Sequence, residues 1–251
     1  MTNLTLTQLI LCFILIFFIG YFVGCVNFAI IISKIKNKGN GDIRSVGSGN
    51  PGMLNMSRAY GIKIGVLILT LDILKGLVPS LIARLVFKHY AYSGMKLEQT
   101  ALFITGLGAV CGHIFPFWLK FKGGKGISTT IGVFAACQFG PAWLFGACAV
   151  AFILITRMGS MGSFIATTPQ AILCSWLYYK AYSGFLELGV ISFKVIFALT
   201  NACIILIIAI TWWAHRKNIQ RLLVGEEHPT NWLQMIKDLK FKSKVKKHKE
   251  K

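Results

Sequence analysis

Long runs of apolar residues constrain the fold of this chain more than any other feature of its sequence. A helix needs roughly 20 apolar residues to cross the hydrocarbon core of a bilayer, which is about 30 Å thick. Runs of that kind occupy residues 4–33, 61–87, 99–119, 162–179 and 188–213. Only 14% of the 251 residues are charged, whereas soluble domains carry about 25%. The sequence therefore predicts an all-α, polytopic membrane protein and excludes a soluble globular domain.

A further apolar stretch, at 125–156, determines how many times the chain crosses the membrane. It is too long for one span and contains Gly140-Pro141, and proline breaks or kinks a helix. Two helices here give seven spans and place 21 of the 27 lysines and arginines on the side that also holds the C-terminus. Basic residues concentrate in cytoplasmic loops. We therefore expect a seven-transmembrane-helix bundle with its N-terminus outside the cell and its C-terminus in the cytoplasm.

The polar segments are too short to form a separate soluble domain. We expect one membrane domain at 1–227, followed by a basic cytoplasmic tail at 228–251. Residues 237–251 include eight lysines, which favours a solvated segment or one attracted to anionic membrane lipid, at about 1 kcal/mol per charge. Nucleic acid is a poor partner for a tail on a membrane protein, and we expect none. The seven cysteines are scattered through apolar runs, as free buried thiols are.

Glycines and small polar residues crowd the first loop on the predicted cytoplasmic side. Three glycines and two asparagines stand between Ser45 and Arg58. The glycines let the backbone turn tightly, so that its N–H groups can point at one anion. Arg58 adds a side chain that can bind two phosphate oxygens at once. A flexible glycine turn is the other interpretation, but the asparagines and the arginine favour an anion site.

The loop within 112–129 combines glycines with lysines directly before a predicted helix. Backbone amides, a lysine side chain and the positive end of the helix dipole together favour an anion. The segment Lys122-Gly123-Gly124-Lys125-Gly126 lacks the spacing of a Walker A loop, so it does not indicate a nucleoside triphosphate. His113, at the start of this loop, is as typical of a structural hydrogen bond as of a binding site.

Two more segments fall on the same predicted side. His215 and Asn218 share one face at helical spacing, directly after the last span. This segment is equally typical of an amphipathic helix whose cations contact lipid headgroups. Arg157 and Ser160 belong to a tight turn between two spans. Together with the two glycine-containing loops, these segments make the cytoplasmic face the predicted location of any chemistry.

Several common kinds of catalytic group are missing from the sequence. Asp72 is the only carboxylate expected to be buried, and we expect Lys75, three residues on, to balance its charge as an architectural pair. Cys-x-x-Cys and His-x-x-x-His spacings, which would suggest a metal, are absent, as is the Gly-x-Ser-x-Gly of a serine nucleophile. Phosphate binders without a nucleophile favour a reaction whose substrate arrives already activated.

Five motifs, in order and at compatible spacing, resemble those of the PlsY family, the bacterial acyl-phosphate-dependent glycerol-3-phosphate acyltransferases. Ser-Gly-Asn-x-Gly-x-x-Asn-x-x-Arg stands at 48–58, and Asp-x-x-Lys-Gly at 72–76. Gly-His-x-Phe-Pro and Phe-x-Gly-Gly-Lys-Gly follow within 112–126. Arg-x-x-Ser-x-x-Ser stands at 157–163, and His-x-x-Asn-Ile-x-Arg-Leu-x-x-Gly-x-Glu at 215–227. The resemblance covers the chain from about residue 10 to 227, which makes it specific.

The resemblance implies a seven-helix enzyme in the bacterial cell membrane, with its active site on the cytoplasmic face. It implies transfer of a fatty acyl group from acyl phosphate to the 1-hydroxyl of glycerol 3-phosphate, giving lysophosphatidic acid and phosphate. No cofactor and no metal would be needed. The chain departs from the family pattern at Met53-Leu54, where the family has Ala-Thr, and at Ala214, where an arginine is usual.

The resemblance also implies which residues act on the substrates. Catalytic roles fall to Ser48, Asn55, Lys125 and His215. Substrate-binding roles fall to Gly47, Gly49, Asn50, Gly52, Arg58, His113, Gly123, Gly124, Gly126, Arg157, Ser160 and Asn218. An organic-anion transporter and a catalytically weak paralogue that binds lipid phosphate stay open as alternative functions.

Overall fold

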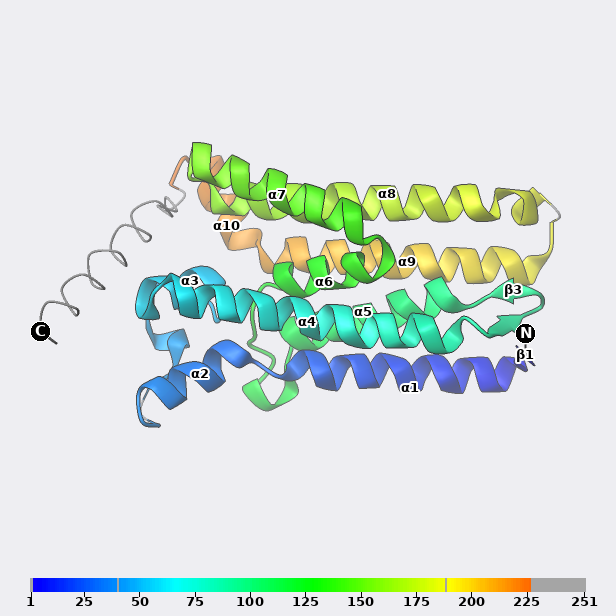
Figure 1. Ribbon diagram of the computed structural model, residues 1–251, viewed down its shortest axis with the longest axis horizontal. Helices are drawn as coiled ribbons and strands as arrows, with labels where there is room; N and C mark the ends of the chain where they lie inside the picture. The colour runs from blue at the N-terminus through cyan, green and yellow to red at the C-terminus, as the bar shows by residue number, and fades with distance from the viewer. Residues whose placement is uncertain (1, 40, 188, 227–251) are drawn as a thin grey trace, which may run out of the picture.

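The computed structural model describes residues 2–39, 41–187 and 189–226, and most of these residues are helical (Figure 1). The α-helices are α1 (Leu6–Cys25), α2 (Phe28–Lys36), α3 (Met53–Tyr60), α4 (Ile62–Phe87), α5 (Glu98–Ile114), α6 (Ile127–Cys137), α7 (Phe139–Thr156), α8 (Gly159–Glu187), α9 (Ile191–Ala214) and α10 (Arg216–Leu223). Two short 3-10 segments, η1 (Ile43–Ser45) and η2 (Phe117–Leu119), lie in loops. The prediction of a helical bundle is confirmed, and the predicted basic tail lies outside the described residues.

A small three-stranded sheet is the departure from an all-helical fold within the described residues. Strand β1 (Thr2–Asn3) pairs in parallel with β2 (Tyr90–Tyr92), which pairs antiparallel with β3 (Met95–Lys96). Ser93 and Gly94 between β2 and β3 both have positive φ, at 50° and 85°, as the favoured two-residue hairpin turns require. Strands of two or three residues are too short to give a periodic pattern that could be recognised in the sequence beside apolar runs of about twenty residues.

Five helical stretches in the described part of the chain are long and apolar enough to cross a bilayer. They are Leu6–Lys36, Ile62–Phe87, Glu98–Leu119, Phe139–Thr156 and Ile191–Ala214. Two of the seven predicted spans fall outside this set. Helix α6 has only 11 residues, and α8, although 29 residues long, is interrupted by polar side chains such as Thr167 and Gln170.

The apolar stretch at 125–156 forms two helices as predicted, but the break lies at Gln138. Pro141 falls instead in the first turn of α7, where backbone N–H groups have no partner within the helix and proline is tolerated. The carbonyls of Ala136 and Cys137 at the end of α6 accept hydrogen bonds from Arg84 of α4, at 2.8 and 3.1 Å. Arg84 thereby allows a short helix to end inside the bundle.

Helices α1 and α5 pack backbone to backbone through glycines on both sides. A Cβ at Gly20 of α1 would lie 2.2 Å from the carbonyl oxygen of Thr105, and one at Gly108 of α5 would lie 2.1 Å from that of Phe17. The next glycine on each helix, four residues on, is equally crowded. Small residues at this spacing let membrane helices approach closely. The pair anchors the end of α5, from which one of the predicted site loops continues.

Replacing Gly20 with valine is expected to lower the free energy of unfolding by about 1–3 kcal/mol, because the new side chain cannot fit against Thr105 without separating the helices. Gly146 of α7 is the matched control, since a Cβ there meets no atom within 4 Å. Thermal unfolding in detergent should therefore show a large drop in Tm for Gly20→Val and a small one for Gly146→Val. Equal drops would contradict the packing argument.

The segments that carry the predicted site residues lie toward one end of the bundle, opposite the N-terminus and the small sheet (Figure 1). These segments are the loop between α2 and α3, α3 itself, the end of α5 with the loop that follows it, the α7–α8 turn, and α10 with the residue before it. The serine–glycine and lysine–glycine segments therefore share one end of the molecule. A common site requires this arrangement.

Candidate functional site

Asn55 holds the first loop (residues 41–52) in shape from within the protein. The residue is 2% exposed, near the start of α3. Its amide nitrogen Nδ2 donates to the carbonyl oxygens of Ile43 and Val46, at 3.2 and 2.8 Å. Its Oδ1 accepts from the backbone N–H of Ser48 at 3.2 Å. The carboxamide is therefore occupied by the loop backbone, and Asn55 shapes the segment that carries Ser48.

The glycines of the first loop are required by this geometry. Gly47 and Gly49 have φ values of 58° and 69°, in the left-handed region that glycine adopts without strain. A Cβ at Gly47 would also lie 2.4 Å from Oδ1 of Asn55. Ser48 between them is exposed, and its Oγ accepts from the backbone N–H of Asn50 at 3.5 Å. Gly52 precedes the first turn of α3.

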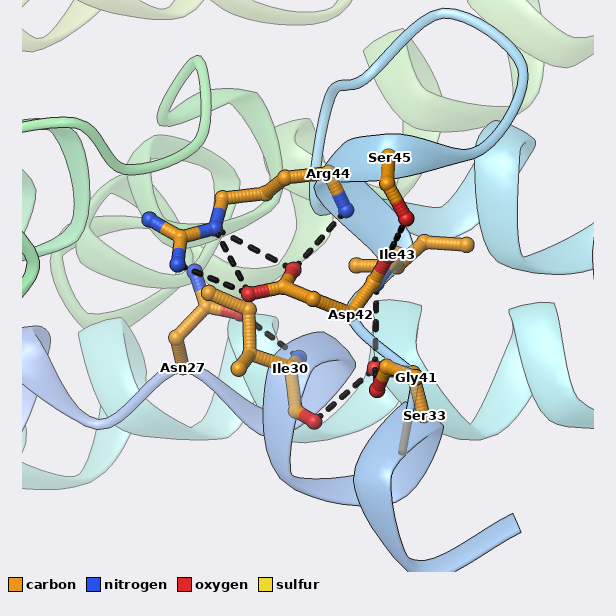
Figure 2. Close-up of polar contacts among 8 residues, drawn as sticks. All are labelled: Asn27, Ile30, Ser33, Gly41, Asp42, Ile43, Arg44 and Ser45. Atoms are coloured by element: carbon orange, nitrogen blue, oxygen red, sulfur yellow. Dashed lines mark hydrogen bonds and ion pairs between the residues drawn. The ribbon is translucent and has the colours of Figure 1, made fainter. Parts of the chain in front are cut away.

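Asp42 and Arg44 form an ion pair at the start of the first loop (Figure 2). Nε and Nη2 of Arg44 donate to the Asp42 carboxylate at 2.7–3.1 Å, and the Arg44 backbone N–H donates to its Oδ1 at 2.9 Å. The Arg44 side-chain hydrogen bonds lower the pKa of Asp42, and the same bonds raise the pKa of Arg44. This pair was not predicted from the sequence, although an Asp-x-Arg spacing beside a glycine loop was a usable signal.

The second loop (residues 115–126) folds back onto the end of α5. The backbone N–H groups of Gly123 and Gly124 donate to the carbonyls of Ile114 and His113, at 3.0 and 3.1 Å. Gly124 lies directly against the buried imidazole of His113, since a Cβ there would be 2.1 Å from Nε2. Gly126, with φ at 86°, precedes the first turn of α6. His113 is therefore placed behind the loop, and the N-terminus of α6 follows directly after Lys125.

Asn218 connects three of the predicted segments through its carboxamide. Its Oδ1 accepts from Nζ of Lys125 at 2.7 Å and from Nη2 of Arg221 at 2.8 Å. Its Nδ2 donates to Oγ of Ser160 at 2.9 Å. The second loop, the start of α8 and α10 therefore converge on one side chain. Arg221 was not selected as a site residue from sequence, and it places a second cation against the same oxygen.

His215 joins this group at the junction of α9 and α10, where it is buried. Its Nδ1 lies 2.9 Å from the carbonyl oxygen of Thr211. A carbonyl can only accept, so we assign the proton to Nδ1, which leaves Nε2 as an acceptor. Burial lowers the pKa of His215 to about 4. The imidazole is therefore neutral at pH 7.

A cleft of about 490 Å³ lies where the first and second loops meet. It is lined by Asp42, Arg44, Ser45, Gly49, Lys122 and Gly123. Lys125, two residues after the last of these, bonds to Asn218. The segment 122–125 therefore shares a cleft with the first loop through Lys122 and Gly123 and bonds to the Asn218 group through Lys125. This segment brings the two halves of the predicted site together.

Two predicted binding residues stand apart from these contacts. Arg58 is exposed on α3, and within the described residues its guanidinium makes no hydrogen bond or ion pair. Arg157 is exposed in a left-handed conformation at the end of α7. The residues covered by the structure contain no cluster of three or more His, Cys, Asp or Glu that could hold a metal. Apart from the Asp42 carboxylate, which is paired with Arg44, the site consists of cations, amides and hydroxyls, which suit phosphate.

Comparison with known proteins identifies what the chain is similar to. The family model described as glycerol-3-phosphate acyltransferase matches residues 14–225. A glycerol-3-phosphate acyltransferase of Mycoplasma pneumoniae is 36% identical over 234 residues, which cover 86% of this chain and 93% of the relative. One from Aquifex aeolicus is 37% identical over 218 residues, covering 86% and 97%.

Two solved structures share the fold. Both are crystal structures of PlsY, described as an integral membrane glycerol 3-phosphate acyltransferase. The glycerol 3-phosphate form superposes with a TM-score of 0.69 at 31% identity, covering 89% of this chain and 98% of that one. The lysophosphatidic acid form gives a TM-score of 0.68 at 30% identity, with the same coverage.

Proposed function

Because this chain belongs to the glycerol-3-phosphate acyltransferase family and is a multi-pass membrane acyltransferase, we propose that it transfers a fatty acyl group from acyl phosphate to the 1-hydroxyl of glycerol 3-phosphate. The products are lysophosphatidic acid and inorganic phosphate. Support comes from the two forms in which the related PlsY was crystallised, with the acceptor and with the acylated product. The observation that carries the proposal is the position of residues 122–125, which line a cleft together with the first loop and bond to Asn218 through Lys125.

The first loop is proposed to bind the phosphate of the acyl donor. The exposed hydroxyl of Ser48 is suited to an anion, whereas the backbone N–H groups of Ser48, Gly49, Asn50 and Gly52 donate hydrogen bonds within the protein. Asn50 and Gly52 belong to the same turn, and Asn55 contributes by holding it in shape. Lys122 and Arg44 border the cleft beside this loop. The first loop therefore contributes the Ser48 hydroxyl, since Arg44 is paired with Asp42, and Lys122 of the second loop contributes positive charge at the cleft.

The Asn218 group is proposed to bind glycerol 3-phosphate. Lys125, Ser160 and Asn218 lie within one hydrogen-bonded network, and neutral His215 stands beside it. Arg58 is retained from the sequence prediction as a further phosphate contact. Lys125 and Arg221 both donate to the neutral amide oxygen of Asn218. Because this oxygen is not part of a carboxylate, these hydrogen bonds can shift to a phosphate without breaking an ion pair there.

The proposed reaction needs no group on the protein to form a covalent bond. The 1-hydroxyl oxygen attacks the acyl carbonyl carbon, the new C–O bond forms, and the bond from that carbon to the phosphate oxygen breaks. The hydroxyl proton passes to an oxygen of the departing phosphate. Acyl phosphate is a mixed anhydride with a good leaving group, so orientation and charge provide most of the rate. Metal and cofactor are not required by these steps.

Purified protein incubated with acyl phosphate and labelled glycerol 3-phosphate tests the function. We expect labelled lysophosphatidic acid and an equal amount of phosphate to form. Acyl-CoA in place of acyl phosphate is the matched control and should give no product. An organic-anion transporter would instead move labelled glycerol 3-phosphate into vesicles without acylating it. A weak paralogue would bind the substrates with negligible turnover, and either result would refute the proposal.

We further propose seven transmembrane helices, α1 and α4 to α9, with the site on the cytoplasmic face of the cell membrane. The charge distribution supports this orientation. Single cysteines in a cysteine-free background test it, because Ser93 is exposed in the turn between β2 and β3 and Ser45 is exposed in η1. The small sheet and the loop between α2 and α3 lie toward opposite ends of the bundle (Figure 1). A membrane-impermeant maleimide should label Ser93→Cys in intact cells and Ser45→Cys only after permeabilisation. The reverse pattern would overturn the orientation.

His215 should make stability depend on pH in a predictable direction. Its folded pKa of about 4 lies below the ordinary value of about 6.5, so the unfolded chain binds a proton first as pH falls. Stability from this residue is complete above pH 6.5 and is lost progressively toward pH 4, by up to about 3 kcal/mol. We expect His215→Gln to reduce the fall in Tm between pH 7.5 and pH 5. Exposed His89→Gln is the control and should behave as wild type.

A further inference from the structure

Three ionisable side chains are buried together inside the bundle, beneath the site. Asp72 and Lys75 of α4 are 3% and 4% exposed, and His113 of α5 is 5% exposed. Nζ of Lys75 lies 2.8 Å from Oδ1 of Asp72, and Nδ1 of His113 lies 3.7 Å from the same oxygen. Charged groups within a membrane span are costly and usually serve function or architecture. The Asp72–Lys75 pair is enough to balance the charge, so charge balance does not explain why His113 is buried beside it.

Lys75 also reaches the break between α1 and α2. Its Nζ donates to the carbonyl oxygen of Val26 at 2.9 Å, a group left without a helical partner because α1 ends at Cys25. Asn27, the next residue, caps α2 by accepting from the N–H of Ile30 at 3.1 Å. Lys75 therefore fixes the point from which α2 starts.

Helix α2 is in turn bonded to the first loop (Figure 2). Oγ of Ser33 accepts from the backbone N–H of Ile43 at 3.2 Å and donates to the carbonyl of Ile30 at 2.9 Å. The carbonyl of Ile43 accepts from Asn55, which shapes the rest of the loop. A continuous series of contacts thus runs from Lys75 through α2 to the loop proposed to bind the acyl donor.

The same cluster reaches the second loop through His113. The imidazole Nδ1 faces Asp72 and has no hydrogen-bond partner in the described residues. Its Nε2 edge lies against Gly124, and its carbonyl accepts from the N–H of Gly124. The lysine–glycine loop therefore rests on a side chain whose other edge faces the Asp72 carboxylate.

We propose that Asp72 and Lys75 are positioning residues for acyl transfer, setting the first loop through Val26 and the second loop through His113. The proposal rests on the proposed function, in which these loops bind the two substrates. It replaces the sequence-based expectation that the pair only balances charge. Neither side chain touches substrate, so both act through the backbone of the loops.

Three variants separate positioning from charge balance. Asp72→Asn and Lys75→Met each leave one buried charge without its partner, and both are expected to lower Tm. The double variant Asp72→Asn/Lys75→Met restores neutrality with side chains of similar size. We expect its Tm to recover to within a few degrees of wild type, while its kcat/KM for acyl transfer stays at least tenfold lower. Recovery of both quantities would show charge balance alone and would overturn the proposal.

Lys75→Arg keeps the charge and provides a second test if the double variant does not fold. Positioning predicts at least a tenfold loss of kcat/KM at near-normal Tm, because a planar guanidinium cannot hold Val26 and Asp72 in the geometry of an ammonium. Activity within twofold of wild type would contradict it. Arg84→Met is the control for loss of an intramembrane cation away from the site, and should lower Tm while the folded protein keeps its turnover.

Hydrogen exchange provides a readout that does not depend on activity. Residues 41–52 and 122–126 should exchange faster in the double variant and in Lys75→Arg, while α7 and α8 keep wild-type protection. Unchanged exchange in both loops would overturn the positioning role. If the wild type itself produces no lysophosphatidic acid, the proposed function fails, and the exchange comparison still decides whether this pair positions the loops.

Discussion

Replacing Lys125 with alanine is expected to lower kcat/KM for glycerol 3-phosphate more than 100-fold. Lys125 is the cation of the second loop that bonds to Asn218, and it directly precedes the turn into α6. In the proposed function the ammonium group of Lys125 pairs with the phosphate of glycerol 3-phosphate. Removing one partner of such a desolvated charge pair costs about 3 kcal/mol, which corresponds to two orders of magnitude in rate. The effect should appear for the acceptor first, because Lys125 contacts the Asn218 group.

Steady-state kinetics with each substrate varied in turn measures this effect. Lys194→Ala is the matched control, since Lys194 is exposed in the first turn of α9, and α9 begins at the end of the bundle opposite α10 (Figure 1). It should retain wild-type kinetics. Thermal unfolding of Lys125→Ala should show that the bundle is intact. Near-normal acyl transfer by folded Lys125→Ala would refute the assignment of the second loop.

The helices could be predicted from sequence because each apolar run carries its own signal. The run at 4–33 was read as one helix, yet α1 ends at Cys25 and α2 begins at Phe28. At this break Lys75, which is distant in sequence, donates a hydrogen bond to the Val26 carbonyl. At the break at Gln138, Arg84 donates to the carbonyls that end α6. Such tertiary hydrogen bonds are invisible to periodicity.

The site could be predicted as a set of segments but not as a set of contacts. Glycine spacing and neighbouring cations marked both loops, because backbone turns are encoded locally. Lys125 and Asn218 meet across 93 positions, and only the packing of α6 against α8 and α9 determines that distance. The direction of the Asn55 side chain was equally hidden, since an asparagine in a polar loop can face inward or outward. Whether each predicted residue binds substrate stays a prediction.

Replacing Asn55 with alanine is expected to lower kcat/KM for the acyl donor by about 100-fold while the KM for glycerol 3-phosphate changes little. The substitution removes three hydrogen bonds to the backbone of the first loop. It leaves the N–H of Ser48 without its partner, whereas the carbonyls of Ile43 and Val46 still accept from the backbone N–H groups of Val46 and Gly49. Each lost hydrogen bond costs about 1 kcal/mol. The loop then shifts, and a displacement of about 1 Å costs about 100-fold in rate.

Asn201→Ala is the matched control, because among the residues that the structure describes the Asn201 amide makes a single hydrogen bond, to the carbonyl of Phe197 in its own helix. It should leave both substrates' kinetics unchanged. Asn218→Ala is the counterpart, and should raise the KM for glycerol 3-phosphate with little change for the donor. This contrast divides the site into a donor half shaped by Asn55 and an acceptor half shaped by Asn218. If Asn55→Ala and Asn218→Ala affected the two substrates alike, the division would be wrong, and one shared phosphate site would explain the cleft better.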